Sequence, residues 1–530
     1  MNGRSVEPES RTAGRRAFLV GAATAYAVMA TRALAQTTTP VPPSPERSRG
    51  YRTAGEQVAD LANRRVSSVE LLDQAIARIE GLDKHINAVV VRDFERARQA
   101  AIAADQALAH GERRPLLGLP MTVKESFNIA GLPTTWGIPA FKDWRPTEDA
   151  VVVERLKAAG AVIIGKTNVP VALADWQSTN PIYGTTSNPY DIERTPGGSS
   201  GGAAAALAAG YVALEAGSDI GGSLRTPAHY CGVFAHKPTY GVLPRRGQSF
   251  PGRPSLPSDG DGLAVVGPMA RSAKDIALAF DVIAGPDEQR EGIGWRLALP
   301  QPRHRALRDF RVLLIDTHPL CPTAEAIRTA LAQLADRLGK EGATVARQSP
   351  LLPDLGEVTR TYMRLLGPVM NQGRPPEYYE RMRSLAATLA PDNQSLDAIF
   401  VRSANVGWRD WEAAAAVRTR LQRQWATLFK QFDVVLCPVM PTVAFKHDHA
   451  ETSARRLDVD GQSQPYTNNI VWAGLATGSA LPATVAPIGP TDTALPIGVQ
   501  IIGPYLEDST TIQFAELLEQ AFGGFVPPVL

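Results

Sequence analysis

Hydrophobic residues recur at helical spacing early in the chain, and each such stretch begins with a recognisable start signal. Thr53 and Glu56, and again Ser67 and Glu70, have the spacing of a capping box, which satisfies free backbone N–H groups at a helix start. Behind the second box, apolar residues repeat every three or four positions: Val69, Leu72, Ile76 and Ile79. Two amphipathic helices are therefore predicted to open the fold.

The next segments alternate between helix and strand patterns. A helix is predicted from Asp93 to His110, and a strand with its exit from Leu116 to Ile129, which puts Lys124 near a strand end. Thr147 is expected to cap a helix that Gly160 ends, ahead of an apolar strand from Ala161 to Gly165. Helix followed by strand, repeated, is typical of an α/β fold layered around a sheet.

Later segments continue this arrangement. Residues 203 to 210 are nearly all alanine, a strong helix former. The sequence from about 285 to 430 is helical and is expected to shape a substrate pocket. Val434–Pro438 and Leu495–Gly503 are predicted to be buried strands that return to the sheet.

The first 35 residues have the pattern of an export signal. Arg15 and Arg16 precede an apolar run to Ala30, and Ala33-Leu34-Ala35 offers a small-residue cleavage site. We expect a twin-arginine signal peptide over 1–35, a Pro-rich linker over 36–50 and the main domain over 51–530. The apolar run is shorter than the roughly 20 residues that span a bilayer, so no permanent membrane anchor is expected. The predicted location is periplasmic or secreted.

Composition excludes several classes of protein. With 44% hydrophobic and 20% charged residues, the 530-residue chain is typical of a soluble globular protein. Residues 1–35 hold five arginines and two glutamates, so without them the net charge falls from +2 to about −1. This argues against a nucleic-acid surface. The three cysteines, Cys231, Cys321 and Cys437, are expected to be buried free thiols rather than a disulfide framework.

The strongest chemical signal is one lysine and two serine-bearing loops. Lys124 is followed by Ser199 and Ser200 inside Gly-Gly-Ser-Ser-Gly-Gly, and by Ser223 inside Asp-Ile-Gly-Gly-Ser-Leu-Arg. A serine hydroxyl needs an adjacent base to attack a carbonyl, and a lysine can serve if burial lowers its pKa. The glycines before Ser223 allow successive N–H groups to converge on an oxyanion. A phosphate-binding loop is disfavoured, because its Lys-Ser/Thr ending is absent.

These motifs resemble those of the amidase signature hydrolases. The likeness is unbroken from Gly197 to Pro227 and continues through Cys231–Phe234 and Lys237–Thr239. The intervals also agree, with 75 residues from Lys124 to Ser199 and 24 from Ser199 to Ser223. The resemblance covers residues 51 to 525. It implies an α/β fold with a single large domain, in which helices flank a mixed β-sheet core.

The resemblance also implies roles for individual residues. Ser223 would be the nucleophile, Lys124 the base and Ser199, preceded by a cis peptide bond, the relay between them. Neither a cofactor nor a metal is implied. The oxyanion hole would be formed by backbone N–H groups of Ile220, Gly221, Gly222 and Ser223. The supports for the two serine loops would be Ser200, Asp219 and Arg225, for which ordinary loop hydrogen bonding is the alternative.

Other candidate residues carry weaker signals. Trp136, Phe141 and Trp176 fall in loops between the base and the serine loop and are candidates for an apolar substrate pocket, although core packing would explain them equally well. The run from Pro170 to Ala174 departs from many relatives, which carry an acidic residue there.

Two rival mechanisms rest on histidines. A histidine triad is disfavoured, since His229 and His236 lie outside a Gly-x-Ser-x-Gly elbow. Metal catalysis is also disfavoured, because the cluster His447-Asp448-His449 lacks the spacing of metal ligands.

The predicted function is an exported serine hydrolase that cleaves carboxylic amide C–N bonds through an acyl-enzyme. We expect a small-molecule amide substrate, no nucleic-acid partner, and a monomer or homodimer. Three alternatives stay open: the amidase subunit of a tRNA-dependent amidotransferase, an enzyme whose main activity is on esters or carbamates, and a binding protein with an inactive site. The export signal argues against the first, and the intact Lys124, Ser199 and Ser223 argue against the last.

Overall fold

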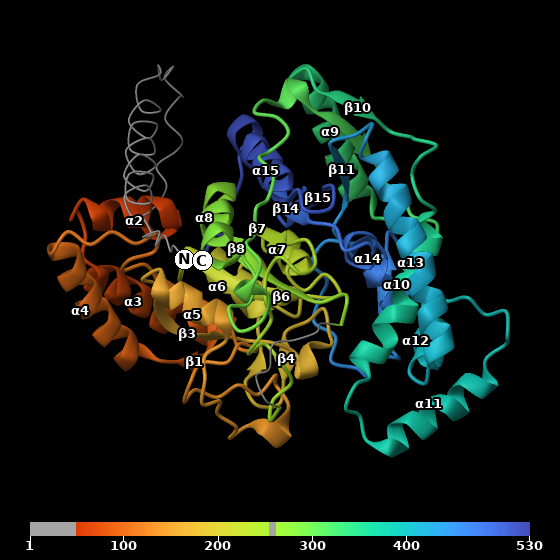
Figure 1. Cartoon of the computed structure of the whole chain (residues 1–530), viewed down its shortest axis with the longest axis horizontal. Helices are drawn as coiled ribbons and strands as arrows, with labels where there is room; N and C mark the ends of the chain where they lie inside the picture. The colour runs from red at the N-terminus through yellow and green to blue at the C-terminus, as the bar shows by residue number, and fades with distance from the viewer. Residues whose placement is uncertain (1–48, 254–260) are drawn as a thin grey trace, which may run out of the picture. The chain divides into compact units, whose positions relative to one another are not determined.

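Stretches rich in Val, Ile and Leu pair into one mixed sheet, which forms the centre of the fold (Figure 1). The computed structural model describes residues 49–253 and 261–530, and Gly50–Leu530 form one compact unit. The predicted signal peptide and all but the last two residues of the predicted linker lie outside the described residues; Arg49–Tyr51 form a short 3-10 turn. In spatial order the strands of the sheet are β1 (Val89–Arg92), β3 (Val162–Thr167), β2 (Pro120–Lys124), β6 (Leu214–Asp219), β8 (Val265–Ala270), β7 (Phe234–Lys237), β14 (Ala483–Pro490), β15 (Pro496–Ile502), β11 (Val434–Pro438), β9 (Arg311–Leu314) and β10 (Thr344–Ala346).

Helices cover both faces of this sheet. One hydrophobic cluster joins a face of the sheet to α5 (Val151–Ala158), α8 (Ala273–Ile283), α9 (Glu325–Lys340) and α15 (Asp508–Phe522). On the other face, a second cluster contains α3 (Ser68–Ile86), α6 (Gly201–Ala208) and α7 (Arg225–Tyr230), and a third contains α10 (Leu355–Met370), α12 (Leu396–Ser403), α13 (Trp408–Leu428) and α14 (Val471–Gly478). The remaining helices and short strands are α2 (Ala54–Ala62), α4 (Phe94–Ala109), α11 (Pro376–Thr388), β4 (Thr179–Asn180), β5 (Gly184–Thr185), β12 (Arg456–Val459) and β13 (Gln462–Pro465). The predicted α/β class with a mixed sheet is confirmed.

The opening helices form as their local signals predict. Thr53 caps α2 and Ser67 caps α3, and in both cases the reciprocal contacts of a capping box are present. Helix α4 lies between Asp93 and His110, as predicted. Because capping is decided by residues within one turn, a sequence pattern is enough to locate these helix starts.

The sheet order places Lys124 where two strands end together. Strands β2 and β6 are parallel neighbours, with Thr122 opposite Glu215 and Val123 opposite Ala216. Lys124 is the last residue of β2, and Asp219 is the last residue of β6. Since parallel strands share one carboxyl edge, the base and the loop that follows β6 emerge side by side.

Helix α6 brings the other serine loop to the same edge. All of its residues are buried, and Ser200 is its N-cap. A Cβ atom on Gly202 would come within 2.3 Å of the Asn168 backbone nitrogen, so only glycine allows this close approach. The alanine-rich segment thus forms a helix as predicted, and the Gly/Ser loop lies at its N-terminus.

Some predicted elements differ from the structure. Thr147 caps no helix: α5 starts after Ala150, with no side-chain cap. The nearby Asp149 carboxylate instead accepts hydrogen bonds from the Ala130 N–H and the Lys157 ammonium group. The strand predicted over Leu116–Ile129 is confined to β2. The region from 285 to 430 is largely helical, but β9 and β10 also lie in it and extend the sheet.

Two further observations concern the cysteines and the possibility of a membrane-spanning helix. Cys231, Cys321 and Cys437 are all buried and unpaired, as predicted. Among the described residues, none of the helices combines the length and the apolar character that crossing a membrane requires.

Candidate active site

Lys124 lies in the interior and its amine contacts two serine side chains. Its Nζ is 2.7 Å from Ser199 Oγ and 3.0 Å from Ser218 Oγ. The Ser218 carbonyl oxygen is 3.5 Å away, at the limit of a hydrogen bond. The predicted contact between Lys124 and Ser199 is therefore present, and Ser218 is a partner that the sequence motif did not indicate.

The surroundings of Lys124 favour its neutral form. Burial lowers the pKa of Lys124 to about 7, although the Asp219 carboxylate, and Glu215 to the extent that it is ionised, act in the opposite direction. Burial also raises the pKa of Glu215 to about 8, so at neutral pH this carboxyl is largely uncharged. An amine with a pKa near 7 has an available lone pair at physiological pH and can accept a proton.

The two serine loops contact each other through their backbones. The peptide bond between Gly198 and Ser199 is cis, as the family resemblance implied. The Ser200 N–H donates to the Ser223 carbonyl at 3.1 Å, and the Ser200 hydroxyl donates to the Ser218 carbonyl at 3.3 Å. Within the described part of the chain, the Ser223 hydroxyl has no hydrogen-bond partner, so it is free to turn toward Ser199 or toward a substrate.

The loop before Ser223 offers fewer free donors than the sequence predicted. The Gly222 N–H donates to Asp219 Oδ1 at 3.0 Å, so it is already engaged. The N–H groups of Ile220, Gly221 and Ser223 donate to no other group that the structure describes. The candidate donors to an oxyanion are therefore the N–H groups of Ile220, Gly221 and Ser223.

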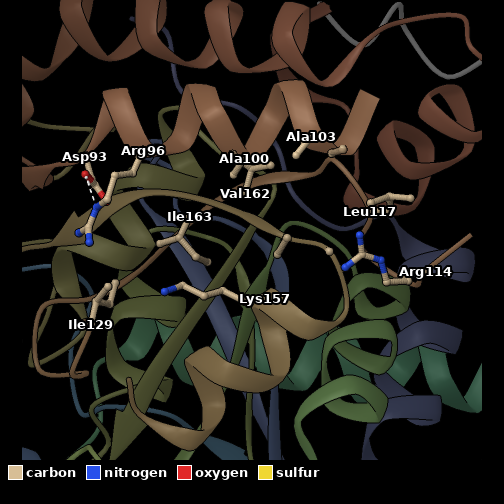
Figure 2. A pocket seen from close by; sticks show the side chains of 13 residues that line it. Asp93, Arg96, Ala100, Ala103, Arg114, Leu117, Ile129, Lys157, Val162 and Ile163 are labelled. Atoms are coloured by element: carbon tan, nitrogen blue, oxygen red, sulfur yellow. Dashed lines mark hydrogen bonds and ion pairs between the residues drawn. The ribbon is translucent and has the colours of Figure 1, made fainter. Parts of the chain in front are cut away.

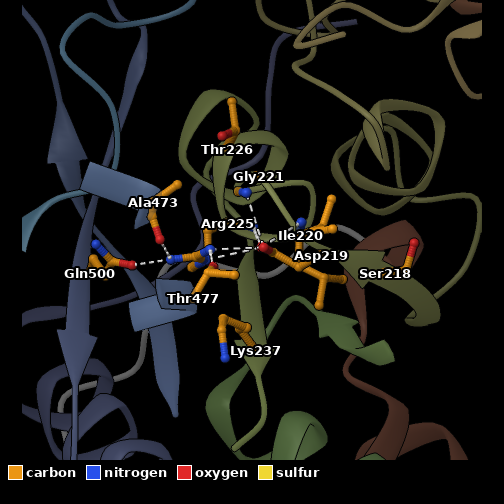
Figure 3. A network of polar contacts seen from close by, with 12 residues as sticks. Ser218, Asp219, Ile220, Gly221, Arg225, Thr226, Lys237, Ala473, Thr477 and Gln500 are labelled. Atoms are coloured by element: carbon orange, nitrogen blue, oxygen red, sulfur yellow. Dashed lines mark hydrogen bonds and ion pairs between the residues drawn. The ribbon is translucent and has the colours of Figure 1, made fainter. Parts of the chain in front are cut away.

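Asp219 and Arg225 hold this loop in shape (Figure 3). The Arg225 guanidinium donates to both Asp219 oxygens, at 2.9 and 2.8 Å, and the pair is buried. Burial would raise the pKa of Asp219, but Arg225 outweighs it, helped by Lys237 and the Leu224 N–H, and lowers this pKa to about 2. Arg225 also donates to three groups from distant segments: the Ala473 carbonyl at 3.0 Å, the Thr477 hydroxyl at 2.8 Å and the Gln500 amide oxygen at 2.6 Å. These contacts join Asp219 and Arg225 to the loop before Ser223 and to distant segments, and their role as supports of the catalytic loops stays a prediction.

The three aromatic candidates for a substrate pocket fall into two groups. The Trp176 indole N–H donates to the Gly221 carbonyl at 2.9 Å, directly against the loop of Ser223. Trp136 and Phe141 instead pack edge-on against Phe250, with ring centroids 5.8 and 5.6 Å apart. Trp136 also donates to the Ser126 carbonyl at 3.2 Å, two residues after Lys124. Their role in lining a pocket stays a prediction.

The histidines near Ser223 have other partners. His229 contacts the Thr442 carbonyl and the Gly498 N–H, and burial lowers its pKa to about 4. His236 contacts Thr484 and Asp508. Neither contacts Ser223 in the described structure, which argues against a histidine triad. His447 and His449 stack on one another with centroids 5.9 Å apart.

A surface cavity of about 380 Å³ lies elsewhere, between α4 and β3 (Figure 2). None of its lining residues belongs to the catalytic candidates. Its three cationic residues each pair with an acid: Arg96 with Asp93, Arg114 with Glu112 and Lys157 with Asp149. We assign this cavity no part in the chemistry.

Comparison with known proteins agrees with the fold and the motifs. The family model described as Amidase matches residues 70–512. A glutamyl-tRNA(Gln) amidotransferase subunit of Saccharolobus solfataricus is 32% identical over 480 residues, which are 87% of this chain and 95% of that protein. A solved structure described as a vestigial protein complex that reveals the origins of an s-triazine catabolic enzyme is 30% identical, with a TM-score of 0.74, and covers 88% of this chain and 98% of its own. A bacterial aryl acylamidase, 24% identical with a TM-score of 0.75 over 89% of this chain and 96% of its own, shares the fold.

The match to the Amidase model over most of the chain defines a hydrolase of C–N bonds. The chain belongs to the amidase signature family.

Proposed function

We propose that this protein hydrolyses carboxylic amides through an acyl-enzyme on Ser223, with Lys124 as the base and Ser199 as the relay. The observation that carries the proposal is the buried Lys124 amine, 2.7 Å from a serine hydroxyl in the loop that contacts Ser223. Burial of this amine costs free energy that its hydrogen bonds offset only in part, and it lowers the pKa of the amine into the range of a general base.

The reaction would begin with two proton transfers. Ser223 loses its proton to Ser199 while Ser199 passes its own to Lys124, and Ser223 Oγ attacks the carbonyl carbon. The oxyanion that forms would be held by the N–H groups of Ile220, Gly221 and Ser223. The same path in reverse protonates the leaving nitrogen as the C–N bond breaks. Water then attacks the acyl-enzyme, with the same base accepting its proton, and releases the acid.

The pH dependence of turnover tests the role of Lys124. We expect kcat/KM to rise about tenfold per pH unit below a pKa of about 7 and to level off above it, because only the neutral amine accepts a proton. Lys124→Arg is the matched variant: arginine stays protonated at every accessible pH, so this variant should be inactive throughout. Rates measured from pH 5 to 9 decide the matter, and a flat profile in the unmodified enzyme would exclude lysine as the base.

The side chains beside the Ser223 loop favour a neutral, apolar acyl group. Trp176 contacts Gly221, and the Tyr362 hydroxyl donates to the Ile220 carbonyl at 2.6 Å. A Cβ atom on Gly221 would lie 3.1 Å from Ile470 Cδ1. The nearby Asp175 carboxylate is occupied by Arg455 at 2.6 Å and by the Tyr466 hydroxyl at 2.7 Å. These contacts leave Asp175 little capacity to bind the ammonium group of an amino-acid substrate.

A second candidate function is that of an amidotransferase subunit. The curated relatives that are named as subunits of glutamyl-tRNA(Gln) amidotransferase favour it, since alignment with them covers at least 93% of their length at 32–33% identity. Such a subunit would use the same chemistry on a small amide donor and would act with partner chains. The aromatic surroundings of the Ser223 loop and the twin-arginine pattern favour the stand-alone enzyme.

A substrate comparison separates the two candidates. We expect the purified chain alone to hydrolyse aryl and aliphatic amides, together with some esters or carbamates, at least tenfold faster than glutamine or asparagine, because the Asp175 carboxylate near the Ser223 loop is already paired. The measurement is kcat/KM for each substrate, with Lys124→Arg as the blank. Preference for glutamine, or activity only with added partner chains, would favour the amidotransferase subunit.

We also propose export across the cytoplasmic membrane, which the Arg15-Arg16 pair and the apolar run behind it support. Cell fractionation checks this location: enzyme found only in the cytoplasm would contradict it.

A further inference from the structure

The Gln248 side chain is linked to Lys124, the proposed base, through one hydroxyl group, that of Ser218. Gln248 is 3% exposed, and its Nε2 is 3.2 Å from Ser218 Oγ and 3.4 Å from Ser126 Oγ. Ser218 Oγ in turn is 3.0 Å from Lys124 Nζ. Gln248 Oε1 accepts from Arg245 Nε at 3.4 Å, which fixes the end of the amide that faces the serines.

This arrangement limits what the Ser218 hydroxyl can do. An amide NH₂ group can only donate, so one lone pair of Ser218 Oγ faces Gln248. A neutral lysine has one lone pair, and two hydroxyls lie within reach of it: those of Ser199 and Ser218. The relay works only if Ser199 donates to this lone pair. The second lone pair of Ser218 Oγ can accept an N–H from Lys124, and this orientation leaves the lysine lone pair to Ser199.

We propose that Gln248 is a positioning residue for the base: by donating to Ser218 Oγ it holds this hydroxyl beside the Lys124 amine, and so holds the amine in its place next to Ser199. The inference rests on the proposed role of Lys124. Gln248 touches neither nucleophile nor relay in the described structure, and it acts on the reaction only through Ser218.

Charged groups around this contact come from two segments. Glu215 and Asp219, both on β6, act on Lys124, and Asp219 is paired with Arg225. On the segment of Gln248, Arg245 pairs with Asp261 at 2.6 Å. A charge introduced at position 248 would therefore lie beside Arg245 and one hydroxyl from Lys124.

Gln248→Leu is the first test. The leucine keeps the apolar volume but donates nothing, so the Ser218 hydroxyl is no longer held and can turn away from the Lys124 amine. We expect kcat to fall about tenfold at every pH, with KM changed less than about twofold, because substrate contacts are unaltered. Circular dichroism and the unfolding midpoint verify that the variant is folded.

Gln248→Glu is the second test and predicts a different signature. A carboxylate held by Arg245 would accept from Ser218 and favour protonated Lys124. The rising limb of the pH profile should then move about one unit to higher pH, and the rate should recover in alkali.

Ser126→Ala is the matched control, since it removes the other hydroxyl that Gln248 contacts and leaves Ser218 in place. Its kcat and pH profile should match those of the unmodified enzyme. An equal loss of kcat in Ser126→Ala and Gln248→Leu, or an unmoved limb in Gln248→Glu, would overturn the proposal. If Lys124→Arg stayed active, the proposed function itself would fail, so the two failures are distinguishable.

Discussion

Ser223→Ala is expected to lower kcat by a factor on the order of 10⁵ or more, because no other group replaces the nucleophile and the remaining loop only binds substrate. The hydroxyl makes no hydrogen bond within the described residues, and its residue is 6% exposed. Its removal therefore leaves no buried partner unsatisfied, and the free energy of unfolding should change by less than about 0.5 kcal/mol.

A serine outside the site supplies the control for Ser223→Ala. Ser384 lies on the exposed helix α11, so Ser384→Ala should keep both turnover and stability. Single-turnover and steady-state rates on an aryl amide measure the effect. Normal turnover in Ser223→Ala would reject Ser223 as nucleophile, whereas loss of turnover together with loss of the folded state would show only a structural role.

Arg225→Met is expected to give the largest loss of stability, about 3–5 kcal/mol of unfolding free energy, because it leaves the Asp219 carboxylate buried without its cation. The same change leaves the Ala473 carbonyl, Thr477 and Gln500 without the donor that joins them to the loop. Denaturant titration followed by circular dichroism measures the difference.

The surface pair of Arg98 and Asp73 supplies the control. Both side chains are at least 40% exposed, so Arg98→Met should change the free energy of unfolding far less than Arg225→Met does. Equal losses in the two variants would mean that burial of the Asp219–Arg225 pair has no special importance. Turnover should also fall in Arg225→Met, because Asp219 fixes the Gly222 N–H and hence the loop geometry.

Local signals explain why much of the fold could be predicted. The capping boxes at Thr53 and Ser67, and the buried strand Val434–Pro438, depend on residues close in sequence or on a run of apolar side chains. Thr147 shows the limit of this reasoning. A threonine before an apolar repeat is a capping signal, but contacts of Asp149 with the distant Ala130 decide where the chain turns.

Residues of the candidate site could be predicted only where they belong to a recognisable sequence motif. The contact between Lys124 and Ser199 follows from the parallel pairing of β2 and β6 and from the glycine-rich loop. Ser218 and Gln248 were missed because their contacts depend on sheet register and on a loop with no pattern of its own. Gln500 could have been noticed in the sequence, because it is a single polar residue in an apolar strand. Its partner Arg225 could not be identified in this way, since it is 275 residues away.

The proposed mechanism depends above all on Ser223 carrying the acyl group. Reaction of the protein with a serine-directed acylating probe, followed by mass spectrometry to locate the adduct, gives the sharpest test. The tryptic peptide from Thr195 to Arg225 also contains Ser199, Ser200 and Ser218, so fragment ions are needed to assign the site. We predict one adduct on Ser223, formed faster as pH rises through about 7 and absent from Ser223→Ala. An adduct on another serine, or undiminished labelling of Ser223→Ala, would contradict this mechanism.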